Sequence, residues 1–125
     1  MRFRAPAGEY GLPVEHVTEV RSAADLTPLP EPRPGVAGLM RRGDEAISVL
    51  SLLGEPGEHI IVIEDGGLTF GLLATEVTGV QAVADASIGP PPPGQDGATV
   101  SGVLAEDGGL VLLLDCASLR RRLSS

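Results

Sequence analysis

Short apolar runs separated by glycine- and proline-rich turns repeat along the whole chain. Residues 59–64 (HIIVIE) are apolar at every inner position, which predicts a central strand buried on both faces. Residues 35–40 and 46–52 form two further apolar runs around a corner at Arg41, Arg42 and Gly43. Glycine accepts positive φ without a Cβ clash, so this corner is expected to reverse the chain tightly.

The pentapeptide EDGGL occurs twice, at residues 64–68 and 106–110, each time between apolar runs. Two hairpin signals of this kind in one short chain predict an all-β meander. The strands expected from the pattern cover residues 2–5, 10–14, a stretch ending near 21, 35–40, 46–52, 59–64, 68–77, 78–84, 100–105 and 110–114. Many short strands are expected to close on themselves, because bare sheet edges invite aggregation.

Local features refine these expectations. Pro13 interrupts the second strand, and a short helical turn is expected before the third. Gly71 is expected to bend the long run 68–77. Asp115 can cap a final helix over residues 117–123, whose last turn contains three arginines that complement the helix dipole.

Two proline-rich stretches are expected to be loops. Residues 22–34 contain prolines at 28, 30, 32 and 34, a spacing that favours a rigid extended connector. A recognition segment for a proline-binding groove is the alternative, but the alternation with Leu29 favours packing on the protein's own surface. Residues 88–97 include four consecutive prolines and are expected to form a surface loop.

Composition limits the architecture. The chain has 125 residues, enough for one compact unit or two very small lobes that share a core. It is 42% hydrophobic but only 2% aromatic, so its core must be built from aliphatic side chains. Seventeen glycines and eleven prolines indicate many turns rather than long helices.

Charge and cysteine content limit the partners and the compartment. The net charge of −8 argues against nucleic acid or anionic membranes as the main partner. One cysteine, Cys116, permits no internal disulfide, which fits a reducing compartment. No apolar run reaches the length of about 20 residues that spans a bilayer, and the start of the chain does not resemble a signal peptide. We therefore expect a cytoplasmic protein without direct membrane insertion.

No constellation of catalytic residues is evident. His16 and His59 are far apart in sequence, neither has metal-site spacing, and a single cysteine offers no usual zinc site. Asp65 and Asp107 lie in hairpin turns, where aspartate is favoured for backbone reasons. All nine basic residues are arginine, which excludes lysine-dependent phosphate or Schiff-base chemistry. We expect no enzyme activity, no cofactor and no metal.

The order of several short motifs resembles one family. The motifs are YGLPV (10–14), VTEV (17–20), TPLP (27–30), PGVAG (34–38), RG (42–43), ISVLSL (47–52), the hairpin 60–73, VTGV (77–80) and a closing LVLLLD (110–115). Together they resemble the CheW-like family, the adaptor proteins of bacterial chemotaxis arrays, from about Phe3 to Leu123. No single motif is specific, but their order and spacing are.

The resemblance implies a fold and a role. The fold would be two small five-stranded SH3-like barrels that share a hydrophobic seam, forming one domain over residues 1–125. The role would be non-enzymatic: coupling the cytoplasmic tip of a chemoreceptor to the regulatory domain of a CheA-type histidine kinase. The alternative is an SH3-like regulatory module that binds a different protein or a small ligand, since fold alone does not determine function.

The resemblance also implies which residues bind partners. They are Val17, Glu19, Gly38, Arg42 and Gly43. Four of them have a structural alternative: Val17 as core, Glu19 as a solvated face residue, Gly38 as a bend, and Arg42 as a solubilising turn residue. A contiguous exposed surface would favour the adaptor role, whereas a buried internal salt bridge at Arg42 would weaken it.

The chain departs from the family pattern at three places. The usual NLRG is MRRG here (40–43), without the Asn, the usual PVIDLR strand has become SVLSLL (48–53), and the following helical segment is reduced to residues 54–57. These departures leave two interpretations open: service in another signalling system, such as surface motility, or loss of one of the two partner contacts.

Overall fold

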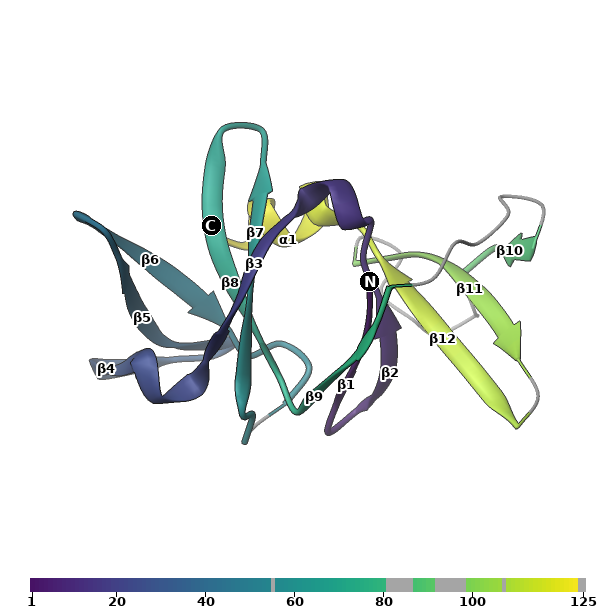
Figure 1. The fold of residues 1–125 in the computed structure, drawn as a ribbon, viewed down its shortest axis with the longest axis horizontal. Helices are drawn as coiled ribbons and strands as arrows, with labels where there is room; N and C mark the ends of the chain where they lie inside the picture. Colours follow the sequence, from purple (N-terminus) through teal and green to yellow (C-terminus); the bar gives the residue numbers. More distant parts are fainter. Residues whose placement is uncertain (55, 81–86, 92–98, 107, 124–125) are drawn as a thin grey trace.

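The computed structural model describes residues 1–54, 56–80, 87–91, 99–106 and 108–123. Within them the chain forms two six-stranded sheets and one α-helix at the C-terminal end (Figure 1). We call the sheet with strand order β10-β11-β12-β2-β1-β9 the terminal sheet, and the sheet with order β3-β7-β8-β6-β5-β4 the central sheet.

The terminal sheet takes its strands from both ends of the chain. Its strands are β1 (Arg2–Ala5), β2 (Gly8–Gly11), β9 (Glu76–Gly79), β10 (Ile88–Gly89), β11 (Val100–Glu106) and β12 (Gly109–Leu114). β12 runs parallel to β2, which joins the C-terminal hairpin to the N-terminal hairpin.

The central sheet is formed by the middle of the chain. Its strands are β3 (Val17–Ser22), β4 (Leu26–Arg33), β5 (Val36–Arg42), β6 (Glu45–Leu50), β7 (His59–Asp65) and β8 (Leu68–Ala74), with the 3-10 turns η1 (Val14–His16) and η2 (Ala23–Asp25) on either side of β3. The helix α1 (Cys116–Leu123) lies at the junction of the two sheets (Figure 1).

Two apolar clusters fill the molecule. The main cluster lies between the sheets and α1, and includes Phe3 and Leu114 of the terminal sheet, Phe70 of the central sheet and Leu119 of α1. The second cluster lies within the curl of the central sheet, around Met40. The two clusters share β7: one face of this strand contributes to each, so the strand is buried on both faces as its sequence predicts.

The local predictions at both ends of the chain are confirmed. The helical turn before the third strand is η1. The cap of α1 is Asp115, whose carboxylate accepts hydrogen bonds from the Ala117 amide at 3.3 Å and the Ser118 hydroxyl at 2.7 Å. No helix in the described part of the chain is long and apolar enough to cross a membrane.

The prediction of a loop over residues 22–34 is wrong. This stretch contains η2 and the eight-residue strand β4, which pairs with β5 at the edge of the central sheet. Proline cannot donate to a strand ladder, but an edge strand needs donors on one side only. The alternating prolines are therefore compatible with an edge strand: they remove main-chain donors, and β4 still pairs with β5 on its other side.

The expected run 68–77 is two strands, not one bent strand. β8 ends at Ala74 and β9 begins at Glu76, and between them the chain leaves the central sheet for the terminal sheet. Gly71 is no bend: it lies inside β8, where a Cβ would come within 2.7 Å of Ile60 Cγ2. The glycine is required by close packing within the sheet.

Two further boundaries differ from the sequence prediction. β2 ends at Gly11, so residues 12–14 do not continue that strand. β9 ends at Gly79, and residues 81–84 of the expected strand 78–84 lie outside the described residues. The loop expected at 88–97 is described only at its start, where β10 pairs with β11.

The five-stranded count is also wrong, because each sheet has six strands. The sixth member of the central sheet is the proline-rich β4, and that of the terminal sheet is the two-residue β10. Among the described residues, strand pairing does not join the two end strands of either sheet, so neither sheet is a barrel closed by hydrogen bonds.

Candidate partner-binding surface

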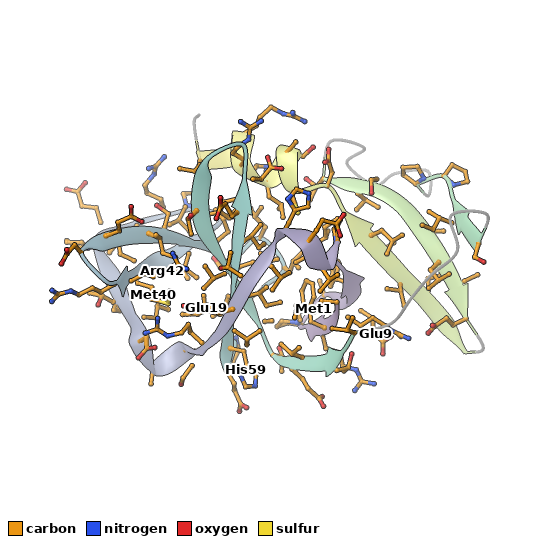
Figure 2. The ribbon with its side chains drawn as sticks, turned by 45° about the horizontal axis from the view of Figure 1, so that its top comes forward. Met1, Glu9, Glu19, Met40, Arg42 and His59 are labelled. Atoms are coloured by element: carbon orange, nitrogen blue, oxygen red, sulfur yellow. The ribbon has the colours of Figure 1, made fainter. Side chains whose placement is uncertain are left out.

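Glu19 and Arg42 meet at one end of the curled central sheet. Glu19 lies in the edge strand β3 and Arg42 at the end of β5, and Glu19 Oε1 is 3.5 Å from Arg42 Nε. These strands are first and fifth in the sheet, so their contact requires the sheet to curl. Both side chains lie beside Met40 of the second cluster (Figure 2), and each is 36% exposed.

A β-bulge determines which way the side chains of β3 point. Val17 pairs with Ile63 but Glu19 pairs with Val62, so Thr18 is an extra residue in the ladder. Ile63 and Val62 are neighbours in β7 and point to opposite faces of the sheet. Their partners Val17 and Glu19 therefore also point to opposite faces, although they are two residues apart. Val17 therefore packs against the main cluster, while Glu19 faces the mouth of the second.

Arg21 extends the ion pair into a network. Its guanidinium contacts Glu19 at 3.1 Å and Asp25 of η2 at 2.9 Å. Hydrogen bonds to Glu19 and to Asp25 raise the pKa of Arg21, so the guanidinium stays charged. Exposed pairs of this kind contribute little stability individually, but a network fixes the positions of its side chains. The result is a polar, charged rim over an apolar interior.

Gly43 forms the corner next to Arg42. The register pairs Arg42 with Glu45, which leaves Gly43 and Asp44 as a two-residue turn. Gly43 has φ of +60°, in the left-handed region, and a Cβ there would meet no atom within 4 Å. The tight corner expected from the sequence is confirmed, and its glycine is exposed next to the Glu19–Arg42 pair.

Gly38 has different surroundings. It is buried in β5 opposite Pro28 of β4, and a Cβ at this position would overlap the Thr27 carbonyl oxygen. The main-chain approach between the two strands therefore requires glycine. Gly38 therefore has a structural role, because it allows β4 to lie close to β5. A role of Gly38 in partner binding stays a prediction.

Of the five predicted site residues, the structure brings together Glu19, Arg42 and Gly43. Val17 lies on the other face of β3, and Gly38 is covered by β4. Arg42 is neither buried nor unpaired: it forms a half-exposed ion pair. The predicted residues that lie together are therefore grouped around Glu19 and Arg42, and a binding role for any of the five stays a prediction.

A second charged cluster, which the sequence does not reveal, is centred on Asp65. Its carboxylate lies 3.0 Å from Arg120 Nε of α1 and 3.6 Å from His16 Nδ1 of η1, and its side chain is only 14% exposed. His16 Nδ1 also lies 3.0 Å from the Glu64 carbonyl oxygen. Asp65 thus links β7, α1 and η1 and is not merely a turn residue. This role is visible only in the structure, because Asp65 and Arg120 are far apart in sequence.

The described residues offer little for catalysis. They contain no group of three or more His, Cys, Asp or Glu side chains that could hold a metal ion. Cys116 is free and buried, and burial, with the nearby Asp65 and Asp115 carboxylates, raises the pKa of its thiol to about 11. The thiol is therefore protonated at neutral pH, which fits the expectation of an inert core residue.

Comparison with known proteins identifies the family. The CheW-like domain matches residues 1–123, almost the whole chain. The chain belongs to the CheW-like family. A similar solved structure is the scaffolding protein TtCheW from Thermoanaerobacter tengcongensis, with a TM-score of 0.81 and 28% identity, covering 91% of this chain and 81% of TtCheW.

A curated relative supports the same assignment. Protein FrzA from Myxococcus xanthus is 35% identical over 105 residues, which cover 77% of this chain. The match spans 66% of FrzA, just under two thirds of its length. TtCheW is, by its name, a scaffolding protein.

Proposed function

We propose that this CheW-like protein is a cytoplasmic adaptor that couples the cytoplasmic tip of a chemoreceptor to the regulatory domain of a CheA-type histidine kinase. The observation that carries the proposal is the match of residues 1–123 to an adaptor family, together with the likeness to the scaffold TtCheW over 91% of the chain. The buried, unpaired Cys116 is compatible with a reducing compartment.

The proposed mechanism is geometric. Residues 1–125 act as one domain, because the main cluster joins both sheets and α1 into a shared core. Each sheet is proposed to be a barrel of the SH3-like kind. The Glu19–Arg42 contact supports this for the central sheet, because it brings two separated strands together. A rigid body with two such lobes can hold a receptor and a kinase in fixed relative positions.

The kinase contact is proposed to lie at Glu19, Arg42 and Gly43. The charged rim offers both signs within a few ångströms, and the exposed turn at Gly43 lets a partner backbone approach closely. Charged pairs at such a rim favour specificity and orientation over raw affinity. Val17 and Gly38 then contribute by placing β3 and β4.

Sedimentation with receptor-containing membranes tests the proposal. With a chemoreceptor and a CheA-type kinase from the same organism, the kinase is expected to co-sediment with the membranes only when this protein is present. Co-sedimentation of the protein without recruitment of the kinase would indicate that one partner contact is lost. Absence of both would contradict the adaptor role and favour an SH3-like regulatory module with a different partner.

A further inference from the structure

A groove of about 430 Å³ lies on the outer side of β4 and β5, next to the end of α1. Its floor is aliphatic, with Leu29 from β4, Val36 and Leu39 from β5, and Leu123 from α1. Arg33 and Arg122 stand beside this floor, together with one carboxylate, Glu31. A groove of this size accommodates a few side chains of a peptide.

The groove faces away from the Glu19–Arg42 surface. In β5, Met40 points into the second cluster and is 0% exposed, whereas its neighbour Leu39 is 36% exposed. Leu39 is paired with Ser48, another residue of the groove, while Met40 is paired with the buried Ile47. Because successive side chains of a strand alternate, Leu39 and Arg41 lie on the outer face and Arg42 on the inner one.

Arg33 and Arg41, which lie near this groove, differ from the arginines that form ion pairs. Among the described residues, ion pairs with carboxylates involve Arg2, Arg4, Arg21, Arg42, Arg120 and Arg121. Within the same described part, no carboxylate lies within 4.0 Å of the guanidinium of Arg33 or Arg41, and both side chains are exposed. Within the described residues, Arg41 donates to the Gly43 carbonyl oxygen, and Arg122 donates to Thr99 Oγ1.

We propose that this groove docks an extended segment of a partner protein that carries aliphatic side chains and carboxylates. The aliphatic floor takes the apolar side chains, and guanidinium groups bind carboxylates in a planar, two-point geometry. Arginine is also enriched where interfaces concentrate their binding energy. Arg33 beside this apolar floor and Arg41 on the outer face of β5 have no carboxylate partner among the described residues, so they are complementary to an acidic segment.

The segment binds through its side chains and not by adding a strand to the sheet. β4 is the edge strand here, and its prolines at positions 28 and 30 remove main-chain donors. Strand addition needs a row of such donors and acceptors. Because the groove and the Glu19–Arg42 pair lie on opposite faces of β5, the segment can bind while a kinase occupies the other face. The inference therefore goes beyond the proposed function and does not depend on it.

Selection from a random dodecapeptide library displayed on phage, with the whole protein immobilised, tests this inference. We expect the enriched peptides to combine carboxylates with leucine, isoleucine or valine. Fluorescence anisotropy with the enriched peptides should then show binding that is weakened about tenfold by Leu39→Ser and by the double substitution Arg33→Glu/Arg41→Glu. Binding should also weaken with added salt, because exposed charge pairs are screened.

Arg42→Glu is the matched control, because it reverses a charge on the opposite face of the same strand. It should leave peptide binding unchanged. Circular dichroism melting of each variant separates lost binding from lost folding. The inference is overturned if no peptide family is enriched, if the enriched peptides lack carboxylates, or if they bind the folded Leu39 and arginine variants as tightly as the unaltered protein.

Discussion

The carboxylate of Glu19 lies 3.5 Å from the guanidinium of Arg42, although β3 and β5 are not neighbours in the central sheet. The contact joins the first and fifth strands across the mouth of the second cluster. It therefore reports the curl of the sheet and also forms the charged rim that we assign to partner binding. Four further features of the structure lead to predictions that do not require a partner.

Gly38→Ala is expected to destabilise the protein by about 2 kcal/mol or more. The added methyl group would overlap main-chain atoms, which cannot rotate aside as a side chain can. The added Cβ would overlap the Thr27 carbonyl oxygen, and β4 would have to move away from β5. Urea denaturation measures the change. Gly109→Ala is the control, since a Cβ there meets nothing within 4 Å. Equal stability of the two variants would show that β4 and β5 are not this close.

Leu119→Ala tests whether α1 belongs to the shared core. Leu119 is 0% exposed within the main cluster. Removing its side chain should cost about 2–5 kcal/mol of unfolding free energy, the range for buried leucine. Leu110→Ala, at a side chain that is 54% exposed, should change little. If thermal melting gives the same small change for both variants, α1 is not packed between the sheets.

Asp65→Asn removes the charge that faces Arg120. Arg120 Nε is buried and has no hydrogen-bond partner among the described residues, so the ion pair with Asp65 at 3.0 Å compensates its charge, and a neutral partner would leave this charge poorly compensated. We expect a loss of about 1–3 kcal/mol, typical for a buried polar group that loses its partner. Asp44→Asn in the exposed corner is the control. The double variant Asp65→Asn/Arg120→Met should lose less than Asp65→Asn alone, because it removes both charges of the pair.

Cys116 makes the free energy of unfolding depend on pH in the alkaline range. Burial raises the pKa of its thiol from 9.0 to about 11. Between these values the unfolded chain loses its proton before the folded chain does, so the stabilising contribution is complete below pH 9 and is lost as the pH rises towards 11. Urea denaturation across this range should show a decline that is smaller in Cys116→Ala. An identical decline in both proteins would mean that the thiol titrates normally in the fold.

The strands with unambiguous patterns could be predicted from sequence. β7 has four consecutive apolar residues, all of them β-branched, in a short run, which favours a strand buried on both faces, and in the structure one face contributes to each cluster. β4 could not be predicted, because its prolines resemble those of a connector. Only the pairing of β4 with β5 shows that the prolines belong to an edge.

The site was less predictable than the fold. The family resemblance named Glu19 and Arg42, but their contact depends on the curl of the sheet, which involves residues far apart in sequence. The bulge at Thr18 places Val17 and Glu19 on opposite faces, against the usual alternation. Nothing in a single sequence indicates such an extra residue. Asp65 was missed for a similar reason: its partner Arg120 comes from the far end of the chain.

Calorimetric titration of this protein against the regulatory domain of a CheA-type kinase from the same organism tests the adaptor role most directly. We predict binding in the micromolar range or tighter, about −8 kcal/mol. Arg42→Glu should weaken this binding while the melting temperature stays nearly unchanged, because an exposed ion pair contributes little to stability. The Arg121→Glu variant, whose charge reversal lies on α1, should bind the kinase domain as tightly as the unaltered protein.

Absence of binding heat at several temperatures, with the protein folded, would contradict the account. So would a strongly lowered melting temperature of the Arg42→Glu variant, which would make Arg42 a structural residue and not part of a binding surface.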